Sequence, residues 1–125
     1  MKHLISMGAF FGLSAVALGA FGAHGLENTL SAHALKRYHT GVEYQFYHVM
    51  AIFVVAIFSQ LQTTPSRLLK TSGISFIVGI LLFSGSLYLY ALTGITTFGI
   101  ITPFGGLALI LGWLFLLIFG IKKGV

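Results

Sequence analysis

The sequence predicts an all-α integral membrane protein, a bundle of four transmembrane helices. Of its 125 residues, 57% are hydrophobic and only 7% are charged, and the mean hydropathy of +0.98 lies outside the range of soluble domains. Crossing a hydrocarbon core of about 30 Å takes about 20 helical residues. Four apolar stretches are that long: residues 4–23, 41–61, 73–92 and 103–121. They fill most of the chain, so we expect one four-span membrane domain over residues 1–125.

Two helix starts are predicted from capping residues. Thr40 and Glu43 have the spacing of a capping box, in which each side chain bonds the backbone N–H of the other residue. Thr102 precedes Pro103, and proline suits the first position of a helix, where its missing N–H costs nothing. The second and fourth helices are therefore expected to begin near Thr40 and Thr102.

The segment between the first two spans, residues 24–42, has a helical pattern of its own. Its apolar residues recur every four positions: Leu26, Leu30, Ala34, Tyr38 and Val42. Charged residues occupy the other faces. This pattern predicts a short amphipathic helix lying at the membrane surface, with a plain connector as the alternative.

The basic residues predict the orientation of the chain, because cytoplasmic loops carry an excess of Lys and Arg. One side of the membrane would hold Lys2, Arg67, Lys70, Lys122 and Lys123. The other side would hold only Lys36 and Arg37. We therefore expect a multi-pass protein with both termini in the cytoplasm.

Small residues form a stripe along one face of the first span: Gly8, Gly12, Ala15, Gly19 and Gly22. In lipid, such stripes let two helix backbones approach closely. Packing within the bundle is one interpretation. A contact between copies of the chain in a homo-oligomer, or with another membrane protein, is the alternative.

Polar side chains gather at one membrane level. With both termini inside, the outer halves of the helices contain most of the polar residues within the spans, whereas the inner halves are almost purely aliphatic and aromatic. The candidate ligand- or partner-binding residues are His24, Glu43, Tyr44, Gln45, His48, Ser84, Ser86 and Tyr88. Polar and ionisable groups within a membrane are costly, which makes this cluster a candidate functional site.

Each of these residues also has a plainer interpretation. Glu43 fits the capping box, the tyrosines fit an interfacial aromatic belt, and His24 fits the end of the first helix. His48 could form an interhelical hydrogen bond, for instance to Ser84 or Ser86. In either case we predict that His48 faces the bundle interior, because an unpaired imidazole in lipid would cost a few kcal/mol.

Several kinds of chemistry lack the residues they need. The chain has no cysteine and only two carboxylates, Glu27 and Glu43. The five histidines match no metal-binding signature, and the serines lack the strand-turn-helix context of a nucleophile elbow. The basic residues flank spans without forming a basic stripe. We expect neither an enzyme nor a metal, cofactor or nucleic-acid binder.

Four motifs carry a resemblance to a known family: Gly19-Ala-Phe-Gly-Ala-His-Gly-Leu26, Thr40-Gly-Val-Glu-Tyr-Gln-Phe-Tyr-His48, Leu82-Phe-Ser-Gly-Ser-Leu-Tyr88, and Thr102-Pro-Phe-Gly-Gly106 followed by Gly112-Trp113. In this order they resemble the domain-of-unknown-function 423 family of small YgdD-like and YwdK-like bacterial inner-membrane proteins, with transmembrane protein 256 as a eukaryotic relative. The resemblance covers nearly the whole chain. It implies a four-span protein of the bacterial cytoplasmic (inner) membrane and supplies no activity, substrate or catalytic residue.

Two functions are compatible with the outer polar cluster. In the first, a non-enzymatic membrane protein uses it to bind a lipid, a small ligand or a partner protein. In the second, it is the external vestibule of a small transporter or channel. A transport path normally needs polar or unwound positions in the inner half as well, where only Gly73, Ser75 and Gly79 stand out. Binding is therefore the favoured hypothesis.

Overall fold

The computed structural model describes residues 2–125 and contains four long helices. They are α1 (Leu4–Phe21), α2 (Ala32–Leu61), α3 (Arg67–Thr93) and α4 (Thr97–Lys123), with a short π-helical stretch, η1 (Gly22–Leu26), continuing α1. All four are long and apolar enough to cross a membrane. Three of the predicted spans lie within α2, α3 and α4, and the first, residues 4–23, covers α1 and the start of η1. The predicted all-α, four-span fold class is confirmed.

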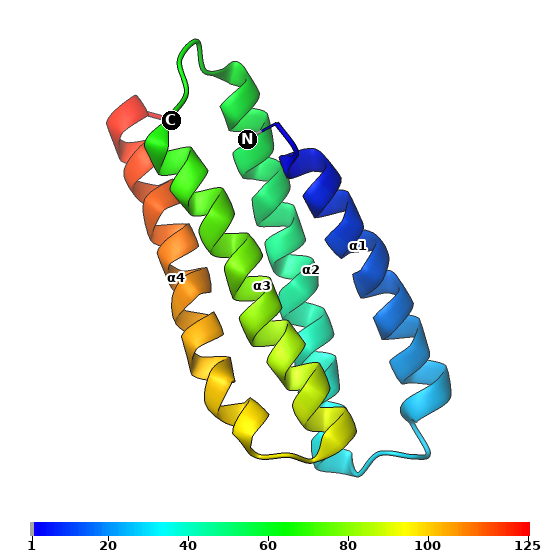
Figure 1. The fold of residues 1–125 in the computed structure, drawn as a ribbon. Coiled ribbons are helices and arrows are strands. Elements are labelled where there is room, and N and C mark those ends of the chain that lie inside the picture. Colours follow the sequence, from blue (N-terminus) through cyan, green and yellow to red (C-terminus); the bar gives the residue numbers. More distant parts are fainter. Residues whose placement is uncertain (1) are drawn as a thin grey trace.

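The helices run alternately up and down, and each packs mainly on its neighbours in sequence. Figure 1 shows both termini and the α2–α3 connection at one end of the molecule. The α1–α2 and α3–α4 connections lie at the other end, called here the loop end. In consequence α2 and α4 run in the same direction, on either side of α3.

The second helix begins earlier than its capping motif predicts. It starts at Ala32, where the Ser31 hydroxyl accepts a hydrogen bond from the Ala34 N–H at 3.1 Å. Thr40 lies inside the helix and donates its hydroxyl to the Lys36 carbonyl at 3.0 Å. The predicted start at Thr40, the capping role of Glu43 and the separate interfacial helix are therefore wrong.

The apolar stripe that suggested an interfacial helix does exist, but it contacts protein. Leu26 and Tyr38 are buried, and the other members of the stripe pack around them against Ala91 and Tyr88 of α3. The Tyr38 hydroxyl also donates to the Leu18 carbonyl of α1. Because α1 and α3 cover the stripe, residues 32–42 form the first turns of α2 and do not make a separate amphipathic helix.

The fourth helix also begins before its predicted start. It starts at Thr97, and the preceding Thr96 makes no side-chain cap. Pro103 lies inside the helix, a position that transmembrane helices tolerate because neighbouring groups satisfy the freed backbone. Thr102 is not a cap: its hydroxyl lies 3.4 Å from the Phe98 carbonyl and 2.6 Å from the Ser86 hydroxyl of α3.

The stripe of small residues on α1 packs against α2 of the same chain. A Cβ at Gly8 would lie 2.9 Å from the Phe53 ring, and one at Gly19 would lie 3.3 Å from Val42. Ala15, between them, is fully buried. The α3–α4 pair is closer still: a Cβ at Gly105 would lie 2.6 Å from the Leu82 backbone. These contacts confirm that the stripe serves packing within the chain.

Candidate functional site

The arrangement of the helices leaves a groove between α2 and α4, with α3 as its floor. We call it the α2–α4 groove. Its volume is about 440 Å³. The lining is largely aromatic and aliphatic, and it consists of Tyr44, Tyr47, His48, Phe83, Gly106, Leu109, Ile110 and Trp113.

A smaller groove lies between α1 and α3, over α2. Its volume is about 170 Å³, and Gln45, Tyr88 and Ser14 line it together with apolar residues of α1 and α3. The predicted polar cluster is thus divided between two separate grooves. His48 and Tyr44 belong to the α2–α4 groove, and Gln45 and Tyr88 belong to the smaller one.

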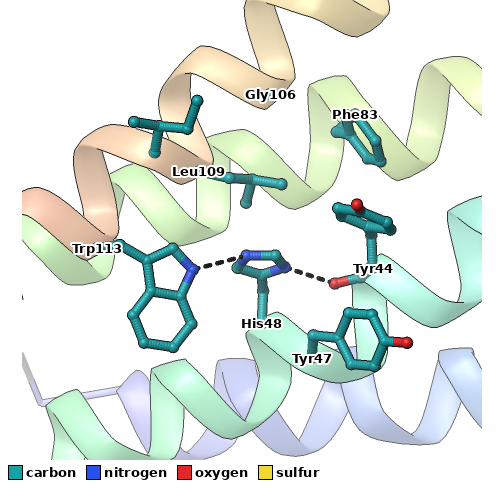
Figure 2. Close-up of a pocket in the computed structure, with 8 residues that line it drawn as sticks. Tyr44, Tyr47, His48, Phe83, Gly106, Leu109 and Trp113 are labelled. Carbon is teal, nitrogen blue, oxygen red and sulfur yellow. Dashed lines mark hydrogen bonds between the residues drawn. The ribbon is translucent and has the colours of Figure 1, made fainter.

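His48 is buried and holds two hydrogen bonds, which Figure 2 shows as dashed lines. Its Nε2 accepts from the Trp113 indole N–H at 3.0 Å, and its Nδ1 lies 2.7 Å from the Tyr44 carbonyl oxygen. An indole N–H can only donate and a carbonyl can only accept. The imidazole is therefore neutral, with its hydrogen on Nδ1. The prediction that His48 faces the interior is confirmed, but neither Ser84 nor Ser86 is its partner.

Trp113 is the hydrogen-bond partner of His48 that sequence reasoning missed. His48 lies sixteen residues after the first residue of α2, and Trp113 lies sixteen residues after the first residue of α4. The two helices run in the same direction, so both side chains reach the same depth. The predicted starts at Thr40 and Thr102 place the two residues at unequal depths. Had the starts of both helices been predicted correctly, their equal spacing would have placed His48 and Trp113 at the same depth.

Gln45 joins three helices through its amide group. Its Nε2 donates to the Phe11 carbonyl at 2.7 Å and to the Ser14 hydroxyl at 2.8 Å, both on α1. Its Oε1 accepts from the Tyr88 hydroxyl of α3 at 2.6 Å. Gln45 therefore links α1, α2 and α3 through hydrogen bonds.

The two serines of α3 join it to its neighbours on either side. Ser84 donates its hydroxyl to the Gly41 carbonyl of α2 at 2.7 Å. The Ser86 hydroxyl lies 2.6 Å from that of Thr102 on α4 and 2.9 Å from the Phe83 carbonyl. Both serines are buried, and their hydrogen bonds are made within the protein.

The remaining candidates lie at the surface of the bundle. His24 is exposed within η1, and Glu43 is exposed on α2, so neither joins the buried polar groups. Tyr44 is 39% exposed, and its ring packs 4.7 Å from that of Phe83, between centroids, at the edge of the α2–α4 groove. The structure therefore brings together four of the eight predicted residues, in two pairs: Tyr44 with His48, and Gln45 with Tyr88. Ser84 and Ser86 are buried but line neither groove.

The chemistry available to the α2–α4 groove follows from these bonds. The ring nitrogens of His48 are both engaged, and Trp113 donates its only N–H. Within residues 2–125 no three His, Cys, Asp or Glu side chains come together to hold a metal ion. What the groove offers a ligand is an aromatic and aliphatic wall, with the hydroxyls of Tyr44 and Tyr47 as its polar groups. This surface is suited to an apolar chain.

Comparison with known proteins identifies the family. Residues 18–106 match the model of the family described as "Protein of unknown function (DUF423)". The chain belongs to this family. The motifs that suggested the resemblance therefore indicated it correctly.

Curated members of the family cover almost the whole chain. UPF0382 membrane protein YwdK of Bacillus subtilis is 43% identical over 122 residues, which is 98% of each chain. UPF0382 membrane protein SSP2132 of Staphylococcus saprophyticus is 46% identical, covering 94% of this chain and 96% of its own. UPF0382 inner membrane protein YgdD of Escherichia coli is 37% identical, covering 99% and 95%. No solved structure matches the chain. Together with the four apolar helices, these relatives identify a membrane protein of an uncharacterised family.

Proposed function

We propose that the protein is a non-enzymatic lipid-binding membrane protein that holds an acyl chain in the α2–α4 groove. The observation that carries this proposal is the groove itself: about 440 Å³ of space between two membrane-spanning helices, with a mainly aromatic and aliphatic lining. An apolar chain gains contact with such a wall and leaves no polar group of its own unpaired.

The position of the groove favours a lipid over a water-soluble ligand. Tyr44, Ile110 and Trp113 are 39%, 64% and 47% exposed, and all three lie on helices able to span a membrane. In a bilayer the groove would open sideways to the acyl chains around it. A lipid could then enter without passing through water.

Transport has weaker support in the half of the bundle nearer the termini. Two buried hydroxyls lie in this half. The Ser72 hydroxyl donates to the Gly112 carbonyl at 2.7 Å, and the Ser59 hydroxyl has no hydrogen-bond partner among the described residues. The helices there are unbroken, whereas transport sites commonly use unwound helices. Ion or solute flux in liposomes that is lost on His48→Ala would contradict the binding-only function.

Filling the groove tests the proposal. A Cβ at Gly106 would lie 3.7 Å from the Phe83 ring, an ordinary contact, so Gly106→Leu should occupy the groove without separating the helices. Gly85→Leu is the matched control, because a Cβ there meets nothing within 4 Å. In native mass spectrometry of protein extracted from membranes, we expect a bound lipid on wild type and on the control but not on Gly106→Leu. Equal lipid on all three, or none on wild type, would refute the proposal.

We also propose that the protein lies in the bacterial cytoplasmic membrane with both termini in the cytoplasm. The basis is the excess of Lys and Arg at the terminal end of the bundle. Alkaline phosphatase fused after Val125 should be inactive, whereas phosphatase inserted between Glu27 and Ser31 should be active. The reverse pattern would show that the loop end faces the cytoplasm.

A further inference from the structure

A second cavity adjoins the α2–α4 groove toward the loop end. Its volume is about 350 Å³. The lining combines one cationic residue with apolar and small ones, namely Arg37, Phe83, Leu87, Tyr90, Gly99, Thr102 and Pro103. We call it the Arg37 cavity. Phe83 lines both spaces, so the two are neighbours.

Arg37 is held in place but is not neutralised. Its guanidinium carbon lies 4.2 Å from the centre of the Tyr90 ring, a cation–π contact between α2 and α3. In the part of the chain that the structure describes, the guanidinium has no ion pair or hydrogen bond. The only two carboxylates of the chain, Glu27 and Glu43, are exposed. Arg37 therefore retains its N–H donors for an anion.

The distance between Arg37 and His48 suits the length of a lipid. They are eleven residues apart on one helix, which corresponds to about 16 Å along its axis. Arg37 lies toward the loop end, among the charged residues expected at the membrane surface, and His48 lies at the depth of Trp113. A headgroup at Arg37 would direct an acyl chain past Phe83, which lines both cavities, toward Trp113.

We infer that the ligand of the α2–α4 groove is an anionic phospholipid whose phosphate pairs with Arg37. This inference rests on the proposed function, and it adds the headgroup chemistry to it. A guanidinium is planar and always charged, and it binds phosphate oxygens through two parallel hydrogen bonds. A zwitterionic headgroup also carries an ammonium group, which Arg37 repels. The site therefore prefers lipids with a net negative charge.

Trp113 provides a direct readout, because it is the only tryptophan of the chain and it lines the groove. Lipids with brominated acyl chains quench tryptophan that they touch. Wild-type protein would be reconstituted in vesicles with brominated phosphatidylglycerol or brominated phosphatidylcholine. Arg37→Gln removes the proposed headgroup partner, and Lys36→Gln is the matched control, since it removes an equal charge from an exposed neighbouring position.

We expect brominated phosphatidylglycerol to quench Trp113 at about one fifth of the concentration that brominated phosphatidylcholine requires. This fivefold ratio corresponds to about 1 kcal/mol, the attraction between an anionic lipid and one basic residue at the surface. Arg37→Gln should reduce this ratio to about one, and Lys36→Gln should keep most of it. If both lipids quench wild type equally, and each quenches wild type more strongly than Gly106→Leu, the headgroup site at Arg37 would be refuted. The proposal that the groove holds an acyl chain would still stand. Quenching by both lipids that is no stronger in wild type than in Gly106→Leu would refute the proposed function itself.

Discussion

The hydrogen bond between His48 and Trp113 should contribute measurably to stability. Trp113→Phe keeps an aromatic ring beside Phe76, whose centroid lies 5.2 Å from that of Trp113, but it removes the N–H that His48 accepts at 3.0 Å. His48 is only 5% exposed, so water cannot replace the lost donor. An unsatisfied buried group costs about 1–3 kcal/mol, whereas interhelical bonds in membranes average about 0.6 kcal/mol. We expect a loss of about 1 kcal/mol in the free energy of unfolding.

A double-mutant cycle separates the hydrogen bond from ring packing. The cycle combines Trp113→Phe with His48→Phe, and the free energy of unfolding is measured by titration with a denaturing detergent in mixed micelles. The coupling energy should be about 0.6–1.7 kcal/mol. Tyr47→Phe, which removes an exposed hydroxyl from the same groove, should leave stability unchanged. A coupling energy of zero would show that the two side chains touch without a stabilising hydrogen bond.

Two further comparisons use the same unfolding assay. Gly105→Ala should destabilise the protein by about 1–3 kcal/mol, because the new methyl group would lie 2.6 Å from the Leu82 backbone and force α3 from α4; Gly106→Ala should not. Ser59→Ala should maintain or raise stability, because the buried Ser59 hydroxyl is without a partner in the described chain. Ser72→Ala should lower stability by about 1 kcal/mol, because it removes a 2.7 Å bond to α4.

Each comparison has an outcome that contradicts it. Equal stability of the Gly105 and Gly106 variants would mean that α3 and α4 are not in close backbone contact. A loss of stability in Ser59→Ala as large as that in Ser72→Ala would mean that the Ser59 hydroxyl has a partner in the membrane.

The four spans and the inward direction of His48 followed from the sequence alone. Hydrocarbon offers no hydrogen bonds, so a spanning chain must form apolar helices, and the few polar side chains within it must point toward protein. The stripe from Gly8 to Gly22 predicted a close helix contact for a similar reason, since only small residues allow two backbones to approach. These conclusions depend only on the polarity and size of each side chain, and both properties can be read from the sequence.

The tertiary structure decided which partner each surface meets. An apolar stripe such as that through Leu26 and Tyr38 has the same spacing whether it faces a membrane surface or packs against other helices. The sequence therefore could not show that α2 extends back to Ala32. That extension places His48 level with Trp113. The α2–α4 groove and the neighbouring Arg37 cavity each depend on the positions of three helices at once. Those positions are set by packing between residues distant in sequence, which cannot be predicted from the residue pattern of any single segment.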